Sequence, residues 1–70
     1  MMPLTFANVG ENNIIKKITG SAEVKKHLES LGFVPGENVS IISENNGNII
    51  VNVKETRVAI SEEMGRRILV

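Results

Sequence analysis

His27 is the only histidine of this 70-residue chain, and its imidazole is the side chain best suited to acid–base or metal chemistry near neutral pH. A nucleophilic mechanism would require a serine motif such as G-x-S-x-G, or a cysteine, and the chain has neither. A metal site would require several converging ligands. Only Glu23, four residues before His27 on the predicted helix, is suitably spaced, since Glu29 follows by two residues. The sequence therefore predicts that the protein is not an enzyme and has no cofactor or metal site.

Glycines and basic residues are the other groups that could bind a phosphate. Gly32 and Gly36 do not belong to G-x-x-x-x-G-K-[ST] or G-x-G-x-x-G, so nucleotide binding is not indicated. Three basic pairs could in principle converge on a phosphate-rich partner: Lys16-Lys17, Lys25-Lys26 and Arg66-Arg67. Basic pairs interspersed with glutamates are more typical of a solvated surface, and only Phe33 could offer a stacking platform. We expect no nucleic-acid partner, and a small RNA-binding barrel stays as an alternative.

Length and composition indicate one small domain over residues 1–70. A chain of this length buries only about 60% of its unfolded surface and has no room for a second core. Eight basic and eight acidic residues cancel, so no strong net field recruits a partner over long range. The start of the chain lacks the basic residues and following apolar run that are typical of a signal peptide. No apolar segment approaches the length of a membrane span. We therefore expect a cytoplasmic protein without direct membrane insertion.

The end of a helix and a tight turn are encoded in consecutive residues near the middle of the chain. Ser21 is a good N-cap for a helix that Gly32 would end in a left-handed conformation. Phe33 would then fold back onto Leu28, as in a Schellman motif. Pro35 and Gly36 next predict a type II turn over residues 34–37, with a strand directly after it.

Strands are expected on both sides of this helix. Alternating or apolar runs predict extended segments at residues 4–6, 14–18, 39–42, 49–53, 57–60 and 68–70. The run at 14–18 alternates imperfectly, and a kink or bulge would reconcile it. Asn46-Gly47 favours a type I′ hairpin, and Ser61 is expected to cap a single helical turn. One helix cannot cover the apolar face of five to six short strands. We therefore predict a mainly β fold in which the sheet curls into a small, partly open barrel with one inserted α-helix.

These residues resemble the ferrous iron transport protein A (FeoA) family over nearly the whole chain. The most specific part is Leu28-x-x-Leu31-Gly32-Phe33-x-Pro35-Gly36, followed by a hairpin, Val58-Ala59-Ile60 and Ile68-x-Val70. The resemblance implies an SH3-like β-barrel, and the same domain is similar to the C-terminal module of bacterial metal-dependent repressors. Two features depart from the family pattern: the Lys54-Glu55-Thr56 turn lacks a common glycine, and Gly65 stands where alanine is common.

The resemblance implies a cytoplasmic accessory protein that docks on the G-protein domain of the ferrous iron transporter FeoB. An apolar anchor beside charged residues is a usual interface pattern, and the helix end offers one. Phe33 has two interpretations, as a packing residue of the helix end or as a partly exposed anchor. The candidate partner-binding residues are Lys25, Lys26, Leu31, Phe33, Val34 and Pro35. The alternative from the same resemblance is an SH3-like module of a metal-dependent transcriptional regulator.

Overall fold

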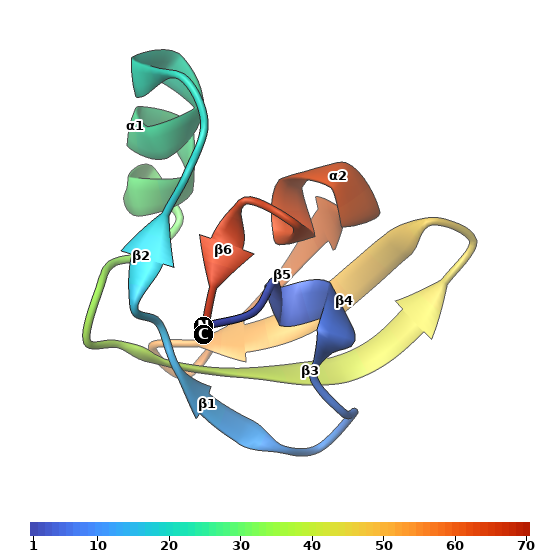
Figure 1. Ribbon diagram of the computed structural model, residues 1–70. Helices are drawn as coiled ribbons and strands as arrows, with labels where there is room; N and C mark the ends of the chain where they lie inside the picture. The colour runs from blue at the N-terminus through green and yellow to red at the C-terminus, as the bar shows by residue number, and fades with distance from the viewer.

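A four-stranded antiparallel sheet and a separate two-stranded sheet form the body of the molecule in the computed structural model, which describes residues 1–70 (Figure 1). The larger sheet has the order β1-β3-β4-β5, with bounds Asn12–Ile14, Asn38–Asn45, Asn48–Val53 and Thr56–Ser61. The smaller sheet pairs β2 (Lys17–Ile18) with β6 (Ile68–Leu69). The helical elements are η1 (Leu4–Phe6), α1 (Ala22–Ser30) and α2 (Glu62–Gly65).

The helix α1 begins and ends as the sequence predicts. The hydroxyl of Ser21 accepts a hydrogen bond from the N–H of Val24 at 3.2 Å. At the other end Gly32 has φ +104°, and the N–H of Phe33 donates to the carbonyl of Leu28 at 3.0 Å. The N–H of Gly32 donates to the carbonyl of Glu29 at 3.0 Å, which completes the Schellman pair of bonds.

Both predicted tight turns are present. Gly36 has φ +92°, and the N–H of Glu37 donates to the carbonyl of Val34 at 3.1 Å, as in a type II turn. Asn46 and Gly47 have φ +45° and +81°, the signs that a type I′ hairpin requires. This hairpin fixes the register of β3 against β4, in which the only irregularity lies between Ile41 and Ser43.

The prediction of an extended segment at residues 4–6 is wrong. Leu4–Phe6 is a 3-10 helix, closed by a 2.9 Å hydrogen bond from the N–H of Ala7 to the carbonyl of Leu4. The side chain of Leu4 is completely buried. The physical reason is tertiary, because one helical turn directs Leu4 into the core and leaves Phe6 exposed.

The single strand expected at residues 14–18 is divided in two. β1 ends at Ile14 and pairs with β3, whereas β2 begins at Lys17 and pairs with β6. Between them Ile15 is buried, so the chain bends at Ile15-Lys16 as it passes from one sheet to the other. This break is the kink that the imperfect alternation suggested.

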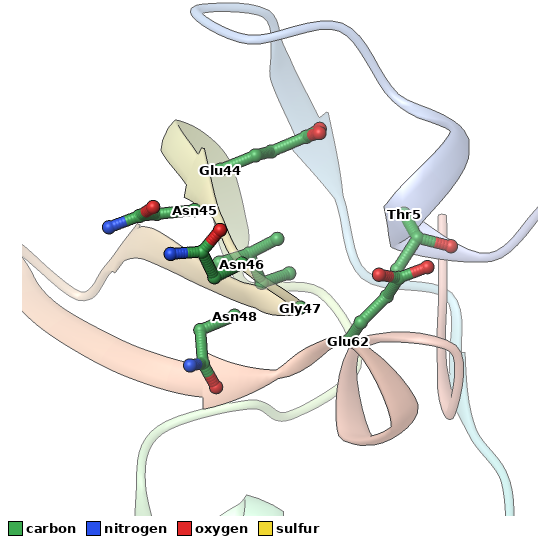
Figure 2. Close-up of a pocket in the computed structure, with 8 residues that line it drawn as sticks. Thr5, Glu44, Asn45, Asn46, Gly47, Asn48 and Glu62 are labelled. Atoms are coloured by element: carbon green, nitrogen blue, oxygen red, sulfur yellow. The ribbon is translucent and has the colours of Figure 1, made fainter.

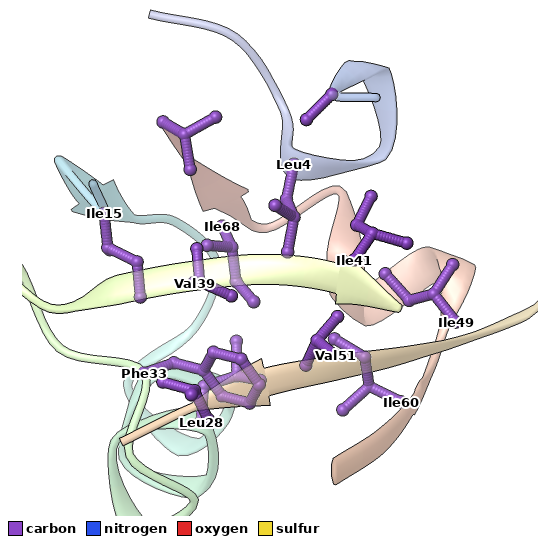
Figure 3. Close-up of a cluster of buried hydrophobic side chains, with 13 residues drawn as sticks. Leu4, Ile15, Leu28, Phe33, Val39, Ile41, Ile49, Val51, Ile60 and Ile68 are labelled. Carbon is purple, nitrogen blue, oxygen red and sulfur yellow. The ribbon is translucent and has the colours of Figure 1, made fainter. Parts of the chain in front are cut away.

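Apolar residues from both sheets, η1 and α1 meet in one core (Figure 3). The core consists of Leu4, Ala7, Ile15, Leu28, Phe33, Val39, Ile41, Ile49, Val51, Val53, Ile60, Ile68 and Val70. Along β4 the buried Ile49, Val51 and Val53 alternate with exposed residues, as predicted. Phe33 is 0% exposed, so its interpretation as a packing residue of the helix end is confirmed.

The mainly β fold class is confirmed, with six short strands and one helix longer than a single turn. The two sheets are not joined into one closed barrel. Neither α-helix has the length and hydrophobicity needed to span a bilayer.

Candidate functional site

A groove lies between α1, β2 and the turn that follows α1, and we call it the lysine groove. It has a volume of about 310 Å³. Its lining combines cationic and apolar side chains from three neighbouring segments of the chain: Lys16, Lys17, Ile18, Lys25, Glu29, Phe33, Val34 and Pro35.

Backbone hydrogen bonds fix the walls of the lysine groove relative to each other. The N–H of Gly36 donates to the carbonyl of Ile15 at 2.8 Å, and the N–H of Ile15 donates to the carbonyl of Glu37 at 2.9 Å. The N–H of Lys16 donates to the carbonyl of Leu69 at 2.8 Å, which ties the same segment to β6. The type II turn is thus held against the β1–β2 junction by backbone hydrogen bonds on both sides of Ile15.

The lysine groove has an excess of positive charge. Lys16, Lys17 and Lys25 line it together with one carboxylate, Glu29. None of these lysines forms an ion pair within 4.0 Å, because the one ion pair of the chain joins Arg66 to Glu62 at 3.3 Å. Their ammonium groups are therefore available to an anionic ligand.

Three of the six predicted partner-binding residues, Lys25, Val34 and Pro35, line the lysine groove with accessible side chains. Phe33 lies beneath them, fully buried, so it supports the groove but does not present its ring to a partner. Lys26 is exposed on α1 but outside the groove, and Leu31 is half-buried against the core. Of the two adjacent lysines of α1, Lys25 therefore lines the groove and Lys26 does not.

Sequence reasoning did not include Lys16 and Lys17 among the candidate contacts. Their basic pair was visible in the sequence, but its position opposite Lys25 depends on how β2 packs beside α1. Arg66, from the third basic pair, pairs instead with Glu62 on the neighbouring turn of α2. Of the three basic pairs, only Lys16-Lys17 and one member of the second pair, Lys25, therefore line the lysine groove.

A second hollow, at the end of the β3–β4 hairpin, is almost entirely polar (Figure 2). It has a volume of about 320 Å³ and is lined by Thr5, Glu44, Asn45, Asn46, Gly47, Asn48, Ile49 and Glu62. Its two carboxylates belong to Glu44 and Glu62, and the latter already accepts a hydrogen bond from Arg66 at 3.3 Å. Nowhere in the chain do three or more His, Cys, Asp or Glu residues gather as a metal site would require.

A third hollow has a volume of about 420 Å³, and none of its lining residues is apolar. It lies over β1, β3 and the β4–β5 turn and includes Asn12, Asn52 and Lys54. The side chain of His27 is exposed and makes no hydrogen bond. The lysine groove is thus the hollow with the most apolar lining residues, and it also has an excess of unpaired cationic side chains.

The arrangement of strands and helices defines a small SH3-like β domain, with the lysine groove on its surface. The family model of the FeoA domain matches residues 2–70, so the chain belongs to the FeoA domain family. The resemblance seen in the Leu28 to Gly36 motif is therefore confirmed.

Individual relatives agree with this assignment. The chain is 34% identical over its whole length to a Methanocaldococcus jannaschii protein described as an Fe(2+) transport protein A, of which it covers 85%. The crystal structure of an iron uptake regulatory protein, FeoA, superposes with a TM-score of 0.87 at 27% identity, covering 94% of this chain and 89% of that one. The FeoA of Stenotrophomonas maltophilia, described as a prokaryotic SH3 domain protein in complex with zinc, has a TM-score of 0.86 at 22% identity. It aligns with 100% of this chain and 89% of its own and supports the SH3-like fold.

Proposed function

We propose that this protein is a cytoplasmic accessory protein of ferrous iron uptake that docks on the G-protein domain of a FeoB-like transporter. Membership of the FeoA domain family and the relative described as an Fe(2+) transport protein support the connection with iron transport. The observation that carries the docking step is the lysine groove, a concave surface with apolar walls and three unpaired lysines.

The groove has the properties of a protein-binding surface. Interfaces combine an apolar centre with a polar rim, and Val34 and Pro35 supply the apolar part here. Lysines at the rim direct the approach of an oppositely charged partner and increase the association rate. The backbone hydrogen bonds at Ile15 hold the turn against the β1–β2 junction, which lowers the entropy lost on binding.

Co-purification with the cytoplasmic domain of the transporter tests this proposal. The tagged protein is expected to retain that domain, and Lys25→Glu is expected to weaken the retention. Lys26→Glu is the matched control, because Lys26 is the next residue on the same helix and lies outside the groove. Failure of the unmodified protein to retain the domain, with or without guanine nucleotide, would overturn the proposal.

A further inference from the structure

We infer that the ligand of the lysine groove is an acidic peptide segment that carries one apolar side chain. This inference rests on the proposed docking function, because it specifies the chemistry of the partner segment that the groove receives.

The apolar part of the groove limits the size of the apolar side chain that the peptide inserts, which we call the anchor. Ile18, Val34 and Pro35 supply the accessible apolar lining of the groove, and the ring of Phe33 is buried. A volume of about 310 Å³ lies at the lower end of the range for ligand pockets, about 300–1,000 Å³. The groove therefore has room for a side chain such as leucine and its flanking backbone, but not for a large cofactor.

The lysines of the groove determine the charge of the peptide residues on either side of the anchor, which should be negative. Lys16 and Lys17 come from the β1–β2 junction and β2, and Lys25 comes from α1, so the cationic groups approach the groove from two elements. A carboxylate on each side of a central apolar residue would meet one of these groups. Because the Debye length is about 8 Å at physiological salt, only charges close to the groove contribute.

The lining favours a peptide over a phosphate polymer or a membrane surface. The carboxylate of Glu29 can accept hydrogen bonds from the backbone N–H groups of a peptide, whereas a row of phosphates has no donor to offer it. No arginine lines the groove, although arginine is the residue suited to bidentate phosphate recognition. The chain also has no net charge to hold it on a polyanion.

Fluorescence anisotropy with a defined peptide tests the inference. The probe is a fluorescein-labelled synthetic peptide with one leucine between two pairs of glutamates. The double variant Lys17→Glu with Lys25→Glu is expected to weaken its binding by about tenfold or more. The double variant Lys26→Glu with Arg57→Glu has the same net charge but leaves the groove intact, so its affinity should stay within about twofold of the unmodified protein. Equal losses in the two variants would overturn the inference.

Changes in the peptide separate the apolar and charged contributions. Replacing the central leucine with serine, or the glutamates with glutamines, should each reduce the affinity. An unlabelled RNA oligonucleotide and phosphatidylserine vesicles serve as competitors, and displacement of the peptide by either at equal charge concentration would contradict the preference for a peptide.

Failure of the acidic-peptide inference can be distinguished from failure of the docking proposal. If the unmodified protein retains the transporter domain and that retention is equal in both double variants, the acidic-peptide inference fails while the docking proposal stands. If the peptide binds in the groove but the transporter domain is not retained, the choice of partner fails while the chemistry of the groove stands.

Discussion

The N–H of Gly36 lies 2.8 Å from the carbonyl oxygen of Ile15, and this hydrogen bond joins the two walls of the lysine groove. Gly36 belongs to the turn that follows α1, and Ile15 belongs to the bend between the two sheets. The turn that follows α1 therefore also holds Val34 and Pro35 in the same groove as Lys16 and Lys17. Gly36 therefore has two roles: its positive φ forms the type II turn, and its N–H holds that turn against Ile15.

Replacing Gly36 with valine should destabilise the protein by about 1–3 kcal/mol, because a β-branched residue resists a φ of +92°. A Cβ atom at this position would meet no other atom within 4 Å, so the cost is conformational and not steric. Urea denaturation measures the change. Gly36→Asn should cost less, since asparagine tolerates this region better. A valine variant as stable as the unmodified protein would contradict the type II turn.

Replacing Phe33 with alanine should cost about 3–5 kcal/mol, because the ring is 0% exposed at the centre of the core. A domain of this size has a total stability of similar magnitude, so we expect the variant to be largely unfolded by circular dichroism. Phe33→Leu should give a smaller, measurable loss in urea denaturation. The matched control is Phe6→Ala, which should change the stability little because Phe6 is 72% exposed. Similar effects at the two phenylalanines would contradict this placement of the core.

Replacing Glu55 with glycine should stabilise the protein by about 0.5 kcal/mol and raise its melting temperature. Lys54 and Glu55 have φ +49° and +62° in the β4–β5 turn, a conformation that glycine adopts without the penalty of a Cβ atom. Part of this gain is offset by the larger entropy of glycine in the unfolded chain. Glu55→Gln removes the charge but keeps the Cβ atom, and it should give no such increase. A glycine variant that melts at a lower temperature would show that the turn is not strained.

Replacing Ser21 with alanine should destabilise the protein by about 1 kcal/mol, because the hydroxyl that caps α1 is lost. The N–H of Val24 would then lack its side-chain partner. Ser30→Ala is the control, since Ser30 lies in the last turn of the same helix and alanine is a good helix former. Thermal denaturation followed by circular dichroism compares the two variants, and a larger loss at Ser30 would contradict the assigned cap.

The features predicted correctly from the sequence are those that neighbouring residues determine. Gly32 with Phe33, Pro35 with Gly36, and Asn46 with Gly47 each specify a turn through their own φ preferences. The alternation at residues 49–53 likewise predicted a strand, and Ile49, Val51 and Val53 are its buried residues. These signals do not depend on the rest of the chain, so they can be interpreted without the structure.

The features that the sequence did not predict depend on tertiary contacts. Residues 4–6 have no strong helical signal, and the burial of Leu4 decides their conformation. The meeting of Lys17 with Lys25 requires both the bend at Ile15 and the position of α1. Half of the predicted partner-binding residues line the groove with accessible side chains, and the remaining cationic wall could be seen only in three dimensions.

The pairing of β2 with β6 has a consequence for the rate at which the chain reaches its native state. The N–H and the hydroxyl of Thr19 both donate to the carbonyl of Arg67, at 2.8 and 3.2 Å, although the two residues are 48 positions apart. Closing so large a loop loses entropy before any contact compensates for it, and proteins dominated by such pairings fold in milliseconds to seconds. The small sheet is therefore expected to form after the β3–β4 hairpin. Because the chain has no tryptophan or tyrosine, stopped-flow circular dichroism is the measurement that would follow this slow step.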